Sequence, residues 1–169
     1  MRLLILLIFL MSNSFANEAL DIKNLVIHKE LKKYDSLTFL NAQKDQLNLD
    51  DYKGNLILLN FWATWCLPCK EEMPSLDLLH ENIDLDNLKI FPINVGQENF
   101  EKTSNFFQDL KIENLKIYFD SPITLAKKLG LRGIPTTILV NKDGLEFARI
   151  VGSINFGDKK FVEWLKNYN

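Results

Sequence analysis

The segment LILLNFWATWCLPCKEEMP, residues 56–74, decides the fold of this chain. Its first seven residues, 56–62, are almost all apolar, which is typical of a strand buried on both faces of a sheet. A helix is expected from about Cys66 to Asn82, because apolar residues recur there at helical spacing: Met73, Leu76, Leu79 and Ile83. The segment therefore predicts a buried strand that runs directly into a helix, with two cysteines at the junction.

Strand-like and helix-like stretches alternate through the rest of the chain. Strands are expected at residues 37–40, 46–49, 89–95, 115–119, 136–140 and 145–151, with a turn at 43–45 and a hairpin at Asp143-Gly144. Helices are expected at residues 100–110, from Ser121-Pro122 to Gly130, and around Phe161, Trp164, Leu165 and Tyr168. Pro92 is awkward in a central strand because it has no N–H to donate. The alternation predicts a three-layer α/β sandwich.

The first sixteen residues have the order of a secretory signal peptide. Arg2 gives a positive start, residues 3–11 are apolar, and small residues at Ser14 and Ala16 precede the expected cut. An uncleaved membrane anchor is the alternative, although the apolar run is shorter than the roughly 20 residues that span a bilayer. Cleavage after Ala16 would place the remaining chain in an oxidising, extracytoplasmic compartment.

Composition limits the possible classes of protein. Residues 17–35 are polar and lysine-rich, which indicates a solvated lead-in to one domain over residues 36–169. The 169 residues are 47% hydrophobic, which suffices for an ordinary core. The net charge is −2 and no stretch is densely basic, so nucleic-acid binding is not expected. Two cysteines are too few for a disulfide-rich scaffold or a four-thiolate metal site.

Both cysteines lie in the tetrapeptide CLPC, residues 66–69, which allows several interpretations. A structural disulfide would close a loop too small to restrain the unfolded chain much. A zinc site needs four ligands, and the two histidines, His28 and His80, lack the spacing of a zinc finger. Two ordinary buried thiols would require neither the preceding tryptophan nor the intervening proline.

A redox-active pair has a direct physical basis. Cys66 stands where the strand passes into the helix, so the free N–H groups and the positive dipole end of the helix face its sulfur. They lower the pKa of the Cys66 thiol below the ordinary value of about 8.5 and supply the attacking thiolate. Cys69 lies one turn further on, close enough to resolve a mixed disulfide. We expect Cys66 to be partly exposed and Cys69 to be buried.

The segment FWATWCLPCKEEMP, residues 61–74, resembles the active-site segment of the thioredoxin superfamily. With the preceding LTFLNAQKDQLNLDDYKGNLILLN, residues 37–60, it is similar to the TlpA/ResA-type extracytoplasmic branch. The likeness covers roughly residues 36–169 and includes Gly133-Ile134-Pro135-Thr136. It implies a thioredoxin-like α/β/α sandwich with a central mixed sheet and a helix–strand insertion within residues 99–130.

The resemblance also implies roles for residues around the pair. Pro135 matches a proline that is cis in the family and faces the cysteines, and the backbone of Ile134 would pair with the substrate. Glu72 matches an acidic residue near the thiols and is assigned to proton handling. Asn60 stands where cytoplasmic thioredoxins carry an Asp that relays protons. A Glu72 that simply faces solvent beside Glu71 is the open alternative.

The flanking residues divide into a surface set and a core set. An exposed apolar rim that docks a peptide around a cysteine is expected from five residues: Trp65, Leu67, Pro68, Ile134 and Pro135. Trp62 continues the buried strand and is expected in the core. His28 and His80 are expected at the surface or at a helix end rather than among catalytic residues.

These features predict an extracytoplasmic thiol-disulfide oxidoreductase that reduces protein disulfides. The electrons reside in two sulfurs, so neither a prosthetic cofactor nor a metal is expected, and a second partner must restore the dithiol. The resemblance implies a membrane-embedded thiol electron donor and clients of the cytochrome c or cytochrome oxidase maturation type. Because Leu67-Pro68 is apolar and Glu71 and Glu72 oppose a thiolate, we expect a potential nearer about −270 mV than about −120 mV.

Three other functions remain open. A copper-delivery protein of thioredoxin fold would need a His or Met beside the two thiolates, and no His follows His80. A peroxiredoxin-like peroxidase would need a lone, proline-flanked cysteine with a Thr three residues before it, whereas Cys69 lies in the same turn as Cys66. An oxidase that donates disulfides differs only in the direction of electron flow.

Overall fold

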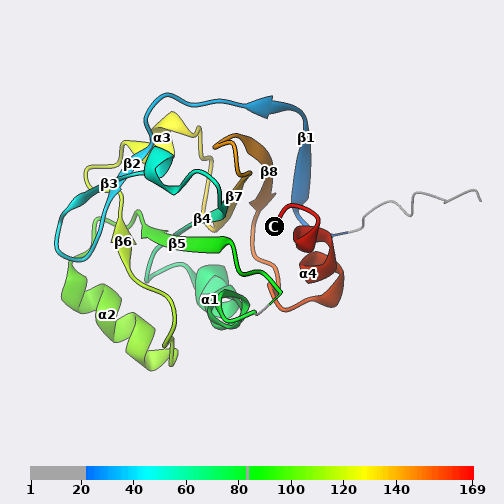
Figure 1. The fold of residues 1–169 in the computed structure, drawn as a ribbon. Coiled ribbons are helices and arrows are strands. Elements are labelled where there is room, and N and C mark those ends of the chain that lie inside the picture. Colours follow the sequence, from blue (N-terminus) through cyan, green and yellow to red (C-terminus); the bar gives the residue numbers. More distant parts are fainter. Residues whose placement is uncertain (1–21, 83) are drawn as a thin grey trace, which may run out of the picture.

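The computed structural model describes residues 22–82 and 84–169, and the signal peptide predicted for residues 1–16 lies outside these ranges. Within them, eight strands form one mixed sheet in the order β1-β8-β7-β4-β5-β6-β2-β3 (Figure 1). The strands are β1 (Leu25–Lys32), β2 (Thr38–Leu40), β3 (Gln46–Asn48), β4 (Leu56–Trp62), β5 (Leu88–Asn94), β6 (Tyr118–Phe119), β7 (Thr136–Val140) and β8 (Glu146–Val151). The helices are the 3-10 helix η1 (Leu49–Tyr52) and α1 (Leu67–His80), α2 (Phe100–Asp109), α3 (Leu125–Lys128) and α4 (Lys159–Lys166).

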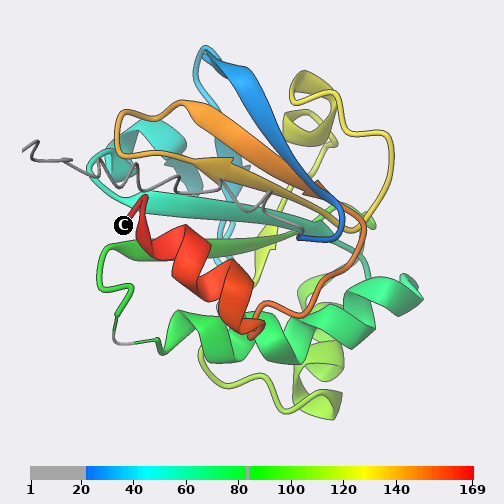
Figure 2. The ribbon, with the colours of Figure 1, turned by 90° about the vertical axis from the view of Figure 1, so that its right-hand side faces the viewer.

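The sheet lies between two helical layers, as the alternating pattern predicts. Figure 2 shows α1, α2 and α4 below the sheet and α3 and η1 above it. One apolar cluster fills the first interface and includes Trp62, Met73 and Phe161. A second cluster, with Ile57 and Leu125, fills the other. The fold is therefore the three-layer α/β sandwich of thioredoxin-like proteins.

Strand β4 occupies the centre of the sheet and leads into α1. All seven of its residues are buried, as the apolar run predicts, and Trp62 lies in the core. It pairs in parallel with β5 and antiparallel with β7, which leaves neither edge of the strand open. Because both faces and both edges are occupied, the end of β4 and the start of α1 are held in a fixed place.

Pro92 is accommodated in β5 because its missing N–H faces away from β4. The N–H of Val95 donates to the Trp62 carbonyl on β4, at 2.9 Å. Successive peptide N–H groups of a strand point to its two edges in turn. Because Pro92 lies three residues before Val95, its nitrogen points to the opposite edge, the β6 side. There β6 pairs only with Ile93 and Asn94, and no ladder bond is lost at Pro92.

The prediction of a solvated lead-in over residues 17–35 is wrong for residues 25–32. These form β1, an edge strand that pairs antiparallel with β8. Most of its side chains are exposed, including the apolar Val26, Ile27 and Leu31. The strand is held instead by the buried Glu146 of β8, which contacts Nε2 of His28 at 2.5 Å and accepts the Tyr34 hydroxyl at 2.7 Å. His28 is thus a partner of a buried carboxylate rather than a free surface residue.

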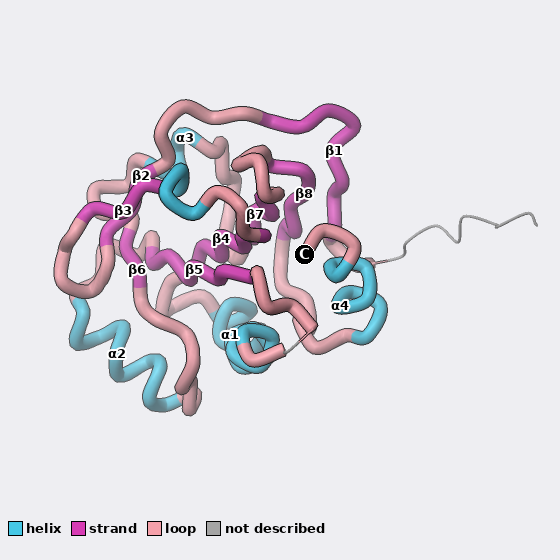
Figure 3. The backbone as a smooth tube through the Cα atoms, in the orientation of Figure 1, coloured by secondary structure: helices cyan, strands magenta, loops and turns pink. Residues whose placement is uncertain are grey.

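Two predicted elements in the insertion are shorter than expected because buried carboxylates bind their backbone. Strand β6 begins at Tyr118, not at Leu115, whose N–H donates to Asp77 of α1 at 2.9 Å. Figure 3 shows loop over most of this connection. Helix α3 begins at Leu125 rather than near Ser121, since the carboxylate of Asp120 accepts the N–H groups of residues 124–126 at 2.8–2.9 Å.

The other predicted boundaries hold to within a few residues. The hairpin between β7 and β8 turns at Gly144, which has a φ of +81°. Gly130, with a φ of +64°, ends the α3 segment as predicted. In the described ranges, no helix is long and apolar enough to cross a membrane.

Candidate active site at the start of α1

Cys66 is the N-cap of α1, and Cys69 lies in the first turn of the helix. The two are joined by a disulfide, with their Cα atoms 5.3 Å apart. The N–H of Cys69 points at Sγ of Cys66, at 3.3 Å. Pro68 stands in the first turn, where its missing N–H removes only a group that a helix start leaves unpaired. The local sequence thus places the Cys66 sulfur against the positive end of the helix.

The two sulfurs differ in surroundings, although less in exposure than predicted. In the disulfide form Cys66 is 5% exposed and Cys69 is 0% exposed. Both belong to the apolar cluster beneath the sheet. Cys66 is the more exposed of the two, as predicted, but in the disulfide form it is buried rather than partly exposed.

Three of the five predicted rim residues are exposed around the pair. Trp65 is 68% and Leu67 is 65% exposed, and Pro68 is exposed as well. Ile134 is half-buried and packs against the apolar cluster that contains both cysteines. Pro135 is buried, and the Ile134–Pro135 peptide bond is cis. The exposed part of the rim is therefore formed by the cysteine loop itself.

Glu72 is buried, which excludes the solvent-facing alternative. It is 2% exposed, one helical turn beyond Cys69 on α1. Its Oε1 accepts Nδ2 of Asn60 at 2.8 Å, and its Oε2 accepts the Ile154 N–H at 3.3 Å. Burial raises the pKa of Glu72 to about 7, and these two hydrogen bonds offset only part of that effect. A carboxyl group with a pKa near 7 can take up and release protons under ordinary conditions.

Asn60 links Glu72 to the neighbouring strand β7. Its Nδ2 also donates to Oγ1 of Thr137 at 2.9 Å, while its buried Oδ1 has no hydrogen-bond partner in the described part of the chain. A neutral amide in this place cannot carry the proton that an aspartate would carry. The buried titratable group nearest in sequence to Cys69 is therefore Glu72.

Glu98 approaches the cysteine loop and was not predicted from the sequence. Its carboxylate accepts the N–H of Thr64 at 2.9 Å and also the Thr64 hydroxyl. Thr64 lies two residues before Cys66. The contact joins residues 34 positions apart. In the sequence Glu98 is only a loop residue before a helix, and nothing near it indicates a contact with Thr64.

The two histidines lie outside this arrangement. His28 is paired with Glu146 on the sheet edge, and His80 is exposed in the last turn of α1. Across residues 22–82 and 84–169, no group of three or more His, Cys, Asp or Glu side chains is placed to hold a metal ion. The chemistry that the site offers is that of a dithiol and its disulfide, beside a buried carboxyl group. Fold and site together define a thioredoxin-like protein with a CxxC redox pair.

Comparison with known proteins gives the family. Residues 28–145 match the AhpC/TSA family. The chain is 33% identical over 121 residues to thiol-disulfide oxidoreductase ResA of Geobacillus thermodenitrificans, a match that covers 70% of this chain and 67% of that protein. The chain belongs to the AhpC/TSA family, as a thiol-disulfide oxidoreductase of the ResA/TlpA type.

Solved structures share the fold. StoA from Bacillus subtilis is 26% identical with a TM-score of 0.63, covering 79% of this chain and 96% of StoA. A secreted thiol-disulfide isomerase from Corynebacterium glutamicum is 23% identical with a TM-score of 0.68, covering 80% of this chain and 87% of that one. The likeness to the second protein concerns the fold alone.

Proposed function

We propose that this chain is an extracytoplasmic reductase of protein disulfides in which Cys66 attacks the client and Cys69 resolves the intermediate. The observation that carries the assignment is the position of Cys66. Its sulfur caps α1 and faces the Cys69 N–H, while Cys69 itself is fully covered. A thiolate at the helix start is stabilised by the free N–H groups, and of the two cysteines only Cys66 has any exposed area.

The exchange balances with two sulfurs on each side. The Cys66 thiolate attacks one sulfur of a client disulfide, and the other client sulfur leaves as a thiolate and takes a proton. Cys69 then loses its proton and attacks Cys66, which releases the second client sulfur as a thiolate that also takes up a proton. The client gains two electrons and two protons, and the enzyme is left with the Cys66–Cys69 disulfide.

Glu72 is the group that we assign to the proton of Cys69. It lies three residues after Cys69 on α1, so the two side chains share one face of the helix. Glu72 also lines a surface cavity with Ser75 and Ile154, which gives its carboxyl group a route to water. With a pKa of about 7, it can accept the thiol proton and return it to solvent.

The exposed rim is assigned to client docking. Trp65 and Leu67 flank Cys66 and are the most exposed large apolar side chains beside the pair. Single exposed apolar side chains are common on a protein surface, but two adjacent to a redox pair are suited to contact an extended peptide. The cis Ile134–Pro135 segment, whose Ile134 packs on the cysteine cluster, is assigned to orient that peptide.

The direction of electron flow is assigned from charge. The residues between the cysteines, Leu67 and Pro68, are apolar, and no cationic side chain lies between the sulfurs. The thiolate therefore lacks the extra stabilisation that makes strong oxidants. We expect a glutathione redox titration to give a potential near about −270 mV, and a value more positive than about −170 mV would place the protein among the oxidants and isomerases.

Location, domain limits and partners are assigned from the sequence and the resemblance. Residues 1–16 have the pattern of a signal peptide, with residues 36–169 as the thioredoxin-like domain. The resemblance to the TlpA/ResA branch supports a membrane-embedded thiol donor and clients of the cytochrome c or cytochrome oxidase maturation type.

Trapping of clients tests the proposal. In a Cys69→Ser variant the mixed disulfide on Cys66 cannot be resolved, so clients should accumulate as adducts that thiol reductants release. The matched control is the Cys66→Ser variant, which should trap few or none. Mass spectrometry of the adducts identifies the clients. Equal trapping by both variants, or none by either, would contradict the assigned roles.

A further inference from the structure

Glu98 stands in the connection between β5 and α2, directly before Asn99, the N-cap of α2. Its side chain is only 4% exposed. The carboxylate contacts three residues: Thr64, Asn94 and Lys102. Oε2 accepts the N–H of Thr64 at 2.9 Å and Nδ2 of Asn94 at 2.8 Å. Oε1 accepts the Thr64 hydroxyl and pairs with Nζ of Lys102 at 2.6 Å.

The backbone around Glu98 is shaped to admit this carboxylate. A Cβ atom at Gly96 would lie 2.6 Å from Oε2 of Glu98 and 3.0 Å from Cβ of Ala63. Any side chain at position 96 would therefore displace the Glu98 carboxylate. The amide of Asn94 is oriented by the Gly96 N–H, which donates to Oδ1 at 3.0 Å. Its Nδ2 is thereby aimed at Glu98. Residues from β5, its loop and α2 thus converge on one carboxylate.

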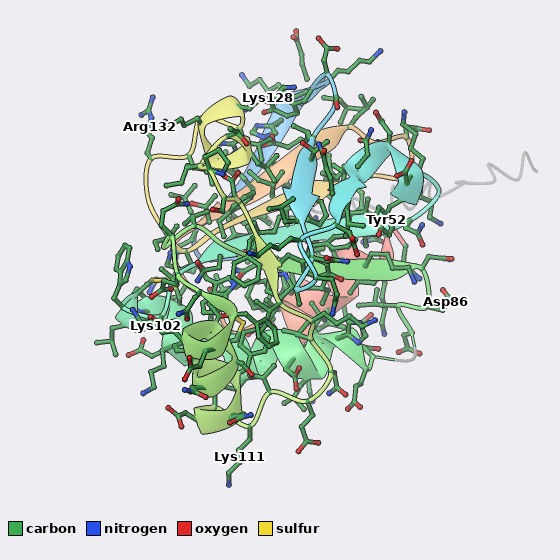
Figure 4. The ribbon with its side chains drawn as sticks, turned by 90° about the vertical axis from the view of Figure 1, so that its left-hand side faces the viewer. Tyr52, Asp86, Lys102, Lys111, Lys128 and Arg132 are labelled. Atoms are coloured by element: carbon green, nitrogen blue, oxygen red, sulfur yellow. A yellow bond between two sulfur atoms is a disulfide. The ribbon has the colours of Figure 1, made fainter. Side chains whose placement is uncertain are left out.

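The partner of Glu98 belongs to the loop that carries Cys66. Thr64 lies between the end of β4 and the N-cap of α1, in a turn closed by the Cys66 N–H on the Ala63 carbonyl at 3.1 Å. The described contacts of the Thr64 N–H and hydroxyl are both to Glu98. Figure 4 shows Lys102 at the end of α2 that lies beside the start of α1. The insertion is therefore tied to the redox loop through Glu98.

The surroundings of Glu98 favour its charged form. Burial alone would raise the pKa of Glu98, but hydrogen bonds from Lys102, Thr64 and Asn94 outweigh it and lower the pKa to about 2. The tie to Thr64 is thus a charge-assisted hydrogen bond, which is stronger than a neutral one. The ion pair with Lys102 balances the negative charge close to the cysteine loop.

We propose that Glu98 is a positioning residue for thiol-disulfide exchange: by holding the Thr64 turn, it keeps the Cys66 sulfur against the first N–H groups of α1. The inference rests on the proposed role of Cys66 as the attacking thiol. Glu98 touches no reacting atom and acts through Thr64. When the turn is released, the thiolate loses part of its contact with the helix start.

The pKa of the Cys66 thiol in the reduced protein distinguishes two possible effects of Glu98, which are to position the Cys66 loop or to act only through its negative charge. Loss of the Thr64 tie in Glu98→Ala should raise that pKa by about half a unit or more, because thiolate stabilisation at a helix start is lost. Below the pKa, alkylation of Cys66 by iodoacetamide should then be about threefold slower. Removal of a negative charge alone would lower the pKa instead.

A second variant tests the hydrogen bond itself. Glu98→Gln keeps an acceptor for the Thr64 N–H but loses the charge, so it should restore most of the wild-type alkylation rate. Thr64→Val, which removes only the hydroxyl contact, should move the pKa in the same direction as Glu98→Ala but less. The control is Glu101→Ala, an exposed residue of the first turn of α2, which should leave the pKa unchanged.

The reagent is small, so the result does not depend on finding a client. A Cys66 pKa that falls or stays the same in folded Glu98→Ala would overturn the inference. If that variant does not fold, as judged by circular dichroism and a denaturant midpoint, an unchanged pKa in Thr64→Val would overturn it equally. Failure to trap clients with Cys69→Ser would contradict the proposed function and leave these thiol measurements unaffected.

Discussion

Replacement of Glu72 by glutamine should flatten the pH dependence of the stability of the disulfide form. The folded protein holds the Glu72 proton more tightly than the unfolded chain does, because burial raises its pKa from 4.5 to about 7. The stability that this proton contributes is fully present below pH 4.5. It is lost as the pH rises through about 7, since the buried group must then ionise.

The size of the effect follows from the two pKa values. They differ by about 2.5, and each pKa unit corresponds to about 1.4 kcal/mol, so full ionisation costs the fold about 3 kcal/mol. Most of that change falls between pH 5 and pH 8, where it amounts to about 2 to 3 kcal/mol. In Glu72→Gln this pH-dependent part of the unfolding free energy should be missing. Any shift in the unfolding free energy that the new amide causes should be the same at every pH.

Urea unfolding at pH 5, 6, 7 and 8 measures the effect, with the disulfide kept intact so that the cysteines do not titrate. The quantity to compare is the slope of the unfolding free energy against pH, not its absolute value. Glu71→Gln is the matched control, because Glu71 is the exposed neighbour on the same helix turn. The reasoning is refuted if Glu72→Gln keeps the wild-type slope, or if Glu71→Gln flattens the slope as much.

Three further predictions follow from burial and contacts. In the reduced protein, Cys66 should react with iodoacetamide faster than Cys69, because only the Cys66 side has any exposed area; equal rates measured by peptide mass spectrometry would contradict the roles. Trp65→Ala should slow the reduction of a protein disulfide but not of a small disulfide, and it should change the urea midpoint little, since Trp65 is exposed. Glu146→Gln should lower stability by about 3 to 5 kcal/mol in urea unfolding, because Arg149, which donates to Glu146 at 2.7 Å, loses its buried partner. Hydrogen bonds from Arg149, His28 and Tyr34 outweigh burial and lower the pKa of Glu146. The stability that Glu146 contributes in the wild type should therefore be present above pH 4.5 and lost on acidification below it. The control Glu30→Gln, at an exposed position of β1, should change neither the stability nor its pH dependence.

The local order of the redox segment was readable from the sequence. A continuous apolar run predicts a buried strand, and helical spacing after it predicts α1, because both patterns repeat within a few residues. The junction between them then places Cys66 at a helix start without any knowledge of the rest of the chain. The same applies to the Asp143-Gly144 hairpin, where turn chemistry is confined to adjacent residues.

The partners of buried polar groups were decided only by the tertiary structure. The helical spacing around Glu72 does not show that Asn60 and Ile154 bind its carboxyl group. Nor does the apolar pattern show that Asp77 accepts the N–H of Leu115, 38 residues away, or that Asp120 accepts the N–H of Leu125, and these contacts shorten β6 and α3. Strand β1 has no apolar alternation, and its pairing with β8 and the contact of His28 with Glu146 are evident only in the structure.

Glu98 shows the same limit most plainly. Its carboxylate meets Thr64 only because α2 packs next to the start of α1, across 34 residues of chain. Hydrophobic periodicity records which face of an element is buried, and it carries no information on which polar atom will meet which across the core. The sequence by itself therefore indicated the fold and the redox pair, and only the tertiary structure decided which polar groups are buried around that pair and which atoms they contact.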